Sequence, residues 1–219
     1  MKRPALWFFD LDDTLHDASH AMFAAIDARM TDYVEAHLQV DRVEANRLRR
    51  AYWLRYGATL LGLVRHHGVD PHHFLESTHD FDIAAHLRAE RGIGAVLARL
   101  PGRKVLLTNA PAAYAGTVLR ELALVRSFSR QVAVEGMRVH GSWRPKPSRS
   151  MLQAMLARER VDPAGAVLVE DSLANLKSAK SLGLTTVLVT GHHRARRCRP
   201  SFVDVAVGSV LELPRWFGR

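Results

Sequence analysis

The chain has 219 residues, of which 47% are hydrophobic and 24% charged, as expected of one globular domain or of one domain carrying an insertion. Its single cysteine, Cys198, excludes an internal disulfide framework, and the apolar run 5–9 is too short for a secretory signal or a membrane span. We therefore expect a cytoplasmic protein with no membrane partner. The net charge of +9 suggests nucleic acid as a partner, but the arginines are spread along helical stretches, which indicates solvated helix faces.

The first half of the chain contains one predicted strand and a long helical stretch. Residues 5–9 are wholly apolar and are predicted to form a buried strand that ends in a polar loop. From about 16 to 99, apolar residues recur every three or four positions, which is typical of amphipathic helices. Trp53 and Leu60 are expected to pack in the interior of this helical region.

After Pro101-Gly102, predicted strands and helices alternate. The expected strands are 104–107, a weak one at 130–134, 166–169, 185–189 and 203–207; the expected helices are 111–122, 148–158 and one from Ser172 to Gly183. Short apolar strands separated by helices indicate an α/β fold, with a parallel sheet covered on both faces. The helical segment between the first two strands is predicted to form a separate lobe.

Polar residues follow several of the predicted strands. They are Asp10, Asp12 and Asp13 after the first strand, Thr108 and Asn109 after the second, Glu170 and Asp171 after 166–169, and Lys146 just before a helix. Ligands bind at the carboxyl ends of the strands in a parallel sheet, so these residues are predicted to form one site. Taken singly, several have ordinary explanations: Thr108 and Asn109 as helix-capping residues, and Lys146 as a solvated lysine.

The residue types in this set suit phosphoryl transfer. Asp10, Asp12 and Asp171 supply the hard oxygen ligands that Mg²⁺ prefers. A carboxylate such as Asp10 attacks phosphorus as a nucleophile, and Asp12 is placed to protonate the leaving group and then to activate water. Thr108, Asn109 and Lys146 are expected to bind the phosphoryl oxygens.

Four motifs in this order resemble those of the haloacid dehalogenase-like hydrolases. They are Phe8-Phe9-Asp10-Leu11-Asp12-Asp13-Thr14-Leu15, Leu106-Leu107-Thr108-Asn109-Ala110, Arg144-Pro145-Lys146-Pro147 and Val169-Glu170-Asp171-Ser172-Leu173-Ala174-Asn175. The resemblance implies a Rossmann-like core, residues 1–15 and 89–219, and an inserted helical cap, residues 16–88. It also implies that Asp10 is the nucleophile and Asp12 the general acid/base.

The same resemblance implies how the metal is held. Mg²⁺ would be bound by the Asp10 side chain, the Asp12 backbone carbonyl and Asp171, with Glu170 or Asn175 acting through water. Thr14 would be a structural residue behind the loop.

Several activities occur on this scaffold. Asp12 favours phosphate ester chemistry over dehalogenation, and the absence of lysine between Lys2 and Lys104 disfavours a phosphonatase, which needs a cap lysine. A phosphosugar phosphatase or phosphomutase, with His20 as acid/base, remains an alternative. A non-catalytic nucleic-acid-binding protein is a distant one.

The stretch Tyr52 to Leu63 resembles the cap of pyrimidine 5'-nucleotidases, which implies a nucleoside monophosphate as substrate. Arg55 and Tyr56 are then the candidate contacts to ribose, phosphate or base. The histidine pairs at 66–67, 72–73 and 192–193 have no partners at zinc-ligand spacing. The basic segment 192–199, Cys198, the tail 214–217 and the oligomeric state receive no assignment.

Overall fold

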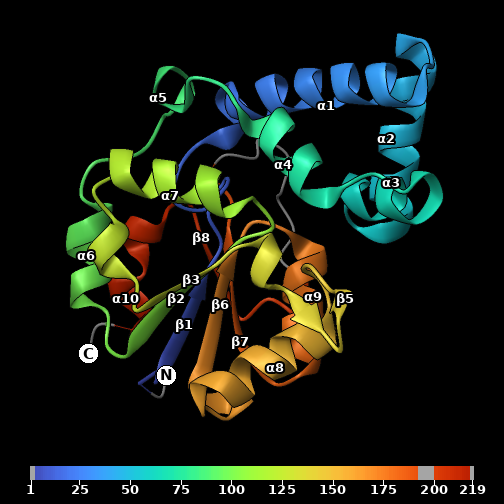
Figure 1. The fold of residues 1–219 in the computed structure, drawn as a ribbon. Helices are drawn as coiled ribbons and strands as arrows, with labels where there is room; N and C mark the ends of the chain where they lie inside the picture. Colours follow the sequence, from blue (N-terminus) through green and yellow to red (C-terminus); the bar gives the residue numbers. More distant parts are fainter. Residues whose placement is uncertain (1–2, 192–199, 218–219) are drawn as a thin grey trace. The chain divides into compact units, whose positions relative to one another are not determined.

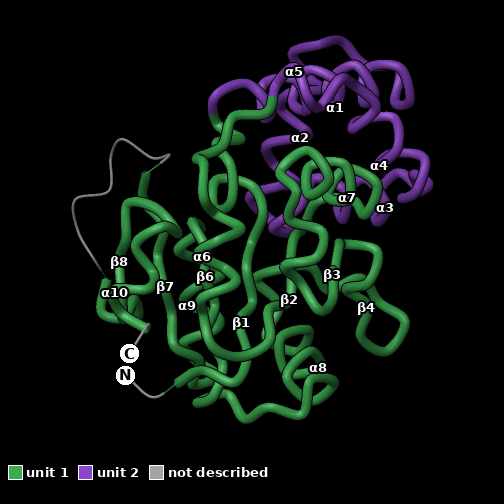
Figure 2. Tube along the Cα trace, turned by 90° about the vertical axis from the view of Figure 1, so that its left-hand side faces the viewer, with its two compact units in different colours: residues 1–19, 87–219 green, residues 20–86 purple. Residues whose placement is uncertain are grey.

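The chain forms two compact units. The computed structural model describes residues 3–191 and 200–217. One unit, the core unit, comprises Met1–Ser19 with Leu87–Arg219, and the other, the cap unit, is His20–His86, as coloured in Figure 2. The insertion is therefore shorter than the predicted 16–88. Residues 16–19 and 87–88 lie in the core unit, where the two chain crossings are joined by a hydrogen bond from Asp17 N to Arg88 O of 2.7 Å.

The core unit is built on a parallel sheet of six strands in the order β3-β2-β1-β6-β7-β8. Its strands are β1 (Leu6–Phe9), β2 (Arg103–Leu107), β3 (Arg130–Val132), β6 (Ala166–Glu170), β7 (Thr185–Val189) and β8 (Val205–Val207). The predicted α/β fold with a parallel sheet is confirmed. A two-stranded hairpin, β4 (Arg138–Val139) with β5 (Ser142–Trp143), was not predicted, because runs of two residues carry no periodicity.

Helices cover both faces of the sheet (Figure 1). They are α6 (Ile93–Arg99), α7 (Ala112–Glu121), α8 (Arg149–Glu159), α9 (Leu173–Ser181) and the short α10 (Pro214–Phe217). Because side chains alternate along a strand, β1 serves both layers. Leu6 and Phe8 join the cluster that includes residues of α8 and α9, whereas the Trp7 ring meets Phe217 of α10 at 4.7 Å. Every β1 side chain is fully buried.

The cap unit is entirely helical, as predicted. Its helices are α1 (Met22–Leu38), α2 (Arg42–Tyr56), α3 (Thr59–His67), α4 (Pro71–His79) and α5 (Ile83–His86). Leu60 is buried as expected, but the prediction for Trp53 was wrong, because this side chain is 61% exposed. The interior of the unit is formed instead by residues such as Tyr33, Val34, Leu63 and Phe74. The apolar character of Trp53 suggested burial, but the side chain lies on the face of α2 that is exposed to solvent.

Three further features of the chain are membrane-spanning potential, the basic segment and the tail. Within residues 3–191 and 200–217, no helix is long and apolar enough to span a bilayer. The basic segment 192–199, with Cys198, lies outside the described residues. The tail forms α10, in which Phe217 is buried and Trp216 is 48% exposed.

Candidate active site

The register of the sheet brings the predicted residues to one edge. Phe9, the last residue of β1, is paired with Leu106 of β2 and with Val169 of β6. Asp10 and Glu170 directly follow Phe9 and Val169, and Thr108 comes two residues after Leu106, just past the end of β2; all three are buried. Three segments far apart in sequence thus place polar side chains at the carboxyl end of the central strands, where ligands bind in such sheets.

Lys146 forms the centre of this cluster. Its Nζ donates to Asp10 Oδ1 at 2.6 Å and to Glu170 Oε2 at 2.8 Å, and its side chain is only 2% exposed. Asn109 positions the backbone of the same residue: its Oδ1 accepts from Lys146 N at 2.9 Å and its Nδ2 donates to Lys146 O at 3.0 Å. The side chain of Asn109 therefore joins the second motif to the backbone of Lys146 in the third motif.

Burial and proximity shift the pKa values in this cluster. Burial, followed by the charge of Glu170, raises the pKa of Asp10 well above its usual value, and Lys146 only partly counteracts this. Burial would also raise the pKa of Glu170, but the charge of Lys146 and hydrogen bonds outweigh it, so the pKa falls to about 2. The pKa of Lys146 is raised because its two carboxylate partners outweigh the effect of burial.

One group of carboxylates fits a cation. Oxygen atoms of Asp10, Glu170 and Asp171 lie within 4.8 Å of one another. Burial and the neighbouring Glu170 raise the pKa of Asp171 to about 10, so in the absence of a metal the group retains a proton. Three oxygen donors facing a single lysine charge suit a hard divalent ion such as Mg²⁺. Asn175, the possible ligand through water, lies on the first turn of α9 and is partly buried.

The Asp12 side chain makes different contacts. Its Oδ1 is 2.7 Å from the hydroxyl of Tyr114, which donates to it, and 2.9 Å from Nε2 of His16. Burial, and next the charge of Asp12, raise the pKa of Tyr114, so this phenol stays protonated and donates. Neither Tyr114 nor His16 was predicted at the site. The spacing of His16, four residues after Asp12, was a usable signal, whereas Tyr114 is 102 residues away.

The remaining loop residues are fixed by local contacts. Asp13 adopts a left-handed backbone, with φ of 54°, and its carboxylate accepts hydrogen bonds from the backbone N, at 2.8 Å, and the hydroxyl of Ser19. Thr14 is buried, and its hydroxyl has no hydrogen-bond partner among the described residues. Thr108 Oγ1 accepts from Ala110 N at 3.0 Å and thus shapes the turn after β2. Asp13 therefore connects the loop after β1 to Ser19, the last residue of the core unit before the cap unit begins.

The sequence of the chain is similar to a known family of proteins. The family model of the haloacid dehalogenase-like hydrolases matches residues 5–183, which include β1, β2, β3 and β6 and the site residues described above. The chain belongs to this family. It is a haloacid dehalogenase-like hydrolase in which Asp10, Asn109 and Glu170 contact Lys146, and Asp171 completes the carboxylate group.

Proteins similar to this haloacid dehalogenase-like hydrolase include both phosphatases and a dehalogenase. Phosphoglycolate phosphatase 1 of Pseudomonas aeruginosa is 24% identical over 96% of this chain and 78% of its own length. A HAD phosphatase from Thermococcus onnurineus has a TM-score of 0.67 and 20% identity, covering 100% of this chain and 98% of its own. An L-2-haloacid dehalogenase from Xanthobacter autotrophicus has a TM-score of 0.60 and 16% identity, covering 97% of both chains. The two structural likenesses show the shared fold.

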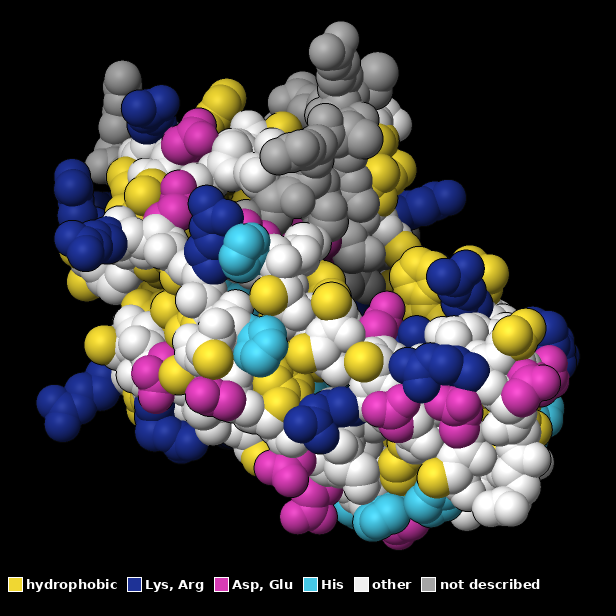
Figure 3. Space-filling view, turned by 90° about the horizontal axis from the view of Figure 1, so that it is seen from above, with side chains coloured by type: hydrophobic (Ala, Val, Ile, Leu, Met, Phe, Trp, Pro, Cys, Tyr) yellow, Lys and Arg dark blue, Asp and Glu magenta, His cyan; other side chains and the backbone are white. Residues whose placement is uncertain are grey.

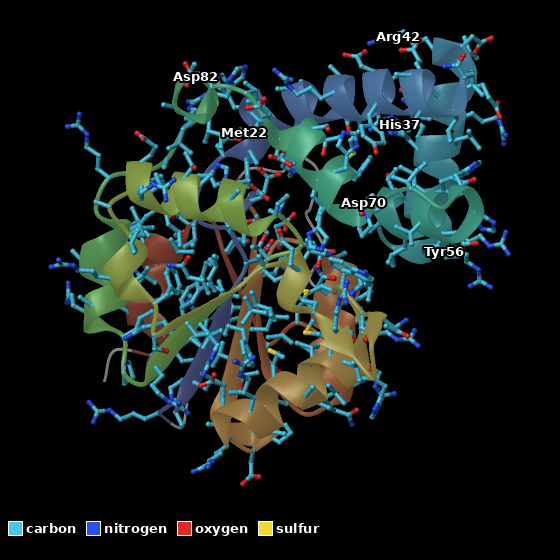
Figure 4. The ribbon with its side chains drawn as sticks, in the orientation of Figure 1. Met22, His37, Arg42, Tyr56, Asp70 and Asp82 are labelled. Carbon is cyan, nitrogen blue, oxygen red and sulfur yellow. The ribbon has the colours of Figure 1, made fainter. Side chains whose placement is uncertain are left out.

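The cap residues predicted to read the substrate form a cluster of their own. The Arg55 guanidinium lies 5.4 Å from the centre of the Tyr56 ring, and that of Arg65 lies 5.9 Å from it. The Tyr56 hydroxyl and His66 Nε2 are 2.6 Å apart. Arg42 and Tyr56 are the first and last residues of α2, and both are labelled in Figure 4. The cluster combines cationic and aromatic groups on the cap unit of this hydrolase.

Proposed function

We propose that this hydrolase is a Mg²⁺-dependent phosphatase that acts on small phosphate monoesters through a phospho-Asp10 intermediate. The observation that carries the proposal is the pairing of Asp10 with Lys146 at 2.6 Å, at the end of β1, with Asp12 two residues later. The pair supplies a nucleophile and a fixed positive charge beside the position that a phosphoryl group would occupy. Asp12 supplies the proton that an ester leaving group needs and a halide does not.

The proposed reaction has two steps. In the first, an Asp10 oxygen forms a bond to phosphorus, the ester P–O bond breaks, and the departing oxygen takes the proton of Asp12. In the second, Asp12 takes a proton from water as the water oxygen bonds to phosphorus. The bond between phosphorus and Asp10 then breaks, and inorganic phosphate leaves. Lys146 offsets the charge on the phosphoryl oxygens in both steps.

Mg²⁺ would be held by Asp10 and Asp171 together with the backbone carbonyl of Asp12, and Glu170 or Asn175 would act through water. The ion, when bound, neutralises charge on the transferring phosphoryl group. The carboxylate group of Asp10, Glu170 and Asp171 supports this assignment, because its oxygens lie within 4.8 Å of one another and one of them otherwise retains a proton.

For the substrate, we propose a pyrimidine nucleoside 5'-monophosphate. The support is the resemblance of the cap stretch 52–63 and the cluster of Arg55, Tyr56 and Arg65, whose cationic and aromatic groups suit an anionic ligand with an aromatic ring. The named relative from Pseudomonas aeruginosa makes 2-phosphoglycolate the second candidate. A sugar phosphate, for a phosphatase or a phosphomutase, is the third.

The test is phosphate release by purified protein, with and without Mg²⁺. The substrates are UMP, CMP, their deoxy forms, purine monophosphates, sugar phosphates and 2-phosphoglycolate. We expect Mg²⁺-dependent release with a preference for the pyrimidine nucleotides. The variant Asp10→Asn should lose more than about 10⁴-fold in kcat while keeping its melting temperature, because it removes the nucleophile. Retained turnover in that variant would contradict the proposed intermediate.

A second experiment separates substrate selection from chemistry. Arg55→Ala and Tyr56→Ala should each lower kcat/KM for the preferred nucleotide about 10-fold and leave hydrolysis of p-nitrophenyl phosphate within about 2-fold. Arg47→Ala is a matched control, because Arg47 lies on the same helix, has a side chain that is 63% exposed and forms an ion pair with half-buried Glu44. Equal effects of all three variants would remove the nucleotide assignment and leave the phosphatase intact.

A further inference from the structure

The Asp12 carboxyl group is held by donors from two separate segments. Tyr114 comes from α7, the helix that follows the Thr108-Asn109 turn, and His16 from the chain just after the catalytic loop. Both contact the same oxygen, Oδ1, at 2.7 Å and 2.9 Å. Both residues are only 1% exposed. Water therefore cannot readily replace either donor, and the orientation of the carboxyl group is set by the protein.

The chemistry of the two partners determines the direction of the hydrogen bonds. Tyr114 stays protonated and donates its hydroxyl hydrogen to Asp12 Oδ1, which accepts it both when the carboxyl group is ionised and when the transferable proton is on Oδ2. We assign an Nε2–H to His16, so that this ring donates to the same oxygen. The other ring nitrogen of His16, Nδ1, is buried and has no hydrogen-bond partner among the residues described. Among the described residues, the His16 ring therefore forms one hydrogen bond, to Asp12. This is unusual, because buried polar atoms are nearly always paired.

The two residues are held by different parts of the core unit. Tyr114 lies on the buried face of α7 with Ala115, Val118 and Leu119. His16 follows the turn in which Leu15 N donates to Leu11 O at 2.8 Å, and the backbones of Asp12 and His16 form an isolated bridge. A packed helix and a hydrogen-bonded loop thus converge on one carboxyl oxygen. Such double support is what a proton-transferring group needs if it is to stay aligned with its substrate.

We propose that Tyr114 and His16 are positioning residues that hold the Asp12 carboxyl group in the orientation required for proton transfer to the leaving group and from water. The proposal rests on the phosphatase function proposed above. Neither residue contacts the phosphoryl group in this scheme. They act through Asp12, so their loss affects the step in which a proton moves and leaves the attack of Asp10 unchanged.

The dependence on the leaving group tests this role. p-Nitrophenolate departs readily without a proton, whereas phenolate from phenyl phosphate, a molecule of nearly the same shape, benefits from protonation. The ratio kcat/KM covers the steps up to the first P–O cleavage, which is where the proton is donated. Tyr114→Phe should lower kcat/KM about 10-fold for phenyl phosphate and stay within about 2-fold of wild type for p-nitrophenyl phosphate. A residue with a merely structural role would lower both by the same factor.

His16 allows a rescue experiment. His16→Gln keeps an N–H donor at a similar reach, and His16→Leu fills similar space without one. The leucine variant should show the leaving-group selectivity of Tyr114→Phe, and the glutamine variant should resemble wild type. In an Asp12→Asn background, Tyr114→Phe should add no more than about 2-fold, because its route of action has been removed. Tyr33→Phe is the matched control, since it removes the 3.0 Å contact between a tyrosine and His73 within the cap unit.

The outcomes separate the two proposals. Equal losses on both aryl phosphates, indistinguishable glutamine and leucine variants, or full additivity with Asp12→Asn would overturn the positioning role while the phosphatase stands. If the wild-type protein releases no phosphate from either compound with Mg²⁺ present, the phosphatase proposal fails and the positioning role fails with it. Melting temperatures of all variants within a few degrees of wild type confirm that folded proteins are being compared.

Discussion

The core and cap units place their charged side chains in different environments. In the core unit, Lys146 is 2% exposed and Glu159 has a side chain that is 4% exposed, and each pairs with two partners that are 24 to 136 residues away in sequence. In the cap unit, Arg42 also has two partners, Asp32 and Glu35, but its side chain is 57% exposed and they lie only seven and ten residues away. Each of these triads joins one charged residue to two of opposite charge, and the central residue is buried in the core unit but exposed in the cap unit.

This difference indicates what each set of charges does. A buried charge must be matched closely, because its removal from water is costly and an unmatched partner is left behind. An exposed pair contributes little, since water and salt screen it. On the face drawn in Figure 3, basic side chains are scattered and several lie beside acidic ones. We infer that the buried charge of Lys146 is matched to its carboxylate partners, whereas the exposed charges around Arg42 mainly maintain solvation.

The largest effect should come from removing the central cation of the site. Lys146→Met leaves Asp10 and Glu170 buried without their partner, so we expect kcat to fall at least about 10²-fold and the free energy of unfolding to fall by about 3–5 kcal/mol. Activity assays and urea denaturation measure the two quantities. Adding Glu170→Gln to this variant should recover part of the stability but not the activity. Recovery of both would show that Lys146 has no role in the chemistry.

An intermediate effect is expected at the other end of the sheet. Glu159, at the end of α8, accepts from Arg103 at the start of β2, at 2.8 Å, and from Arg130 at the start of β3, at 2.7 Å. Glu159→Gln removes the charge and keeps the shape, so the free energy of unfolding should fall by about 2 kcal/mol. Phosphate release should be unchanged, because the site lies at the carboxyl ends of the strands. A change in kcat without a change in stability would contradict this division.

The smallest effect is expected for the exposed triad of the cap. Arg42→Gln removes the centre of the pairs with Asp32 and Glu35, yet urea denaturation should detect no change beyond its error. The Arg42 and Glu159 variants form a matched set, since each removes one charge from a triad. A loss as large as that of Glu159→Gln would show that burial of the central charge makes no difference between the two triads. A smaller loss that disappears in high salt would show that the exposed pairs act through screened attraction.

The sequence predicted most of the core fold, for physical reasons. The strands of the sheet are short apolar runs bounded by polar or turn residues, so their positions could be predicted from the sequence to within about two residues. The polar residues after β1, β2 and β6 were predicted to meet, because parallel strands end at the same edge. Asn109 was assigned to phosphate, but in the structure its side chain is engaged with the backbone of Lys146.

What sequence could not supply are contacts that depend on side-chain direction between distant segments. Tyr114 meets Asp12 across 102 residues, and nothing in the spacing of α7 indicates which loop its hydroxyl reaches. Trp53 was misplaced for a related reason, since a helix with many arginines gives a weak apolar periodicity. The interior of the cap depends on which faces of α1 to α4 pack together, and that is decided by tertiary structure.

The hydrogen bond between Asp17 and Arg88 has a consequence for how the chain can be altered. It joins the segment entering the cap to the segment leaving it, so the core unit already holds the two ends of the insertion together. In polymer terms, His20–His86 is a closed loop, and the entropy of closing a loop changes only slowly with its length. Residues 20–86 can therefore be shortened, extended or exchanged for another segment with little effect on the topology of the sheet. The pair of Asp10 and Lys146 can in this way be combined with different insertions.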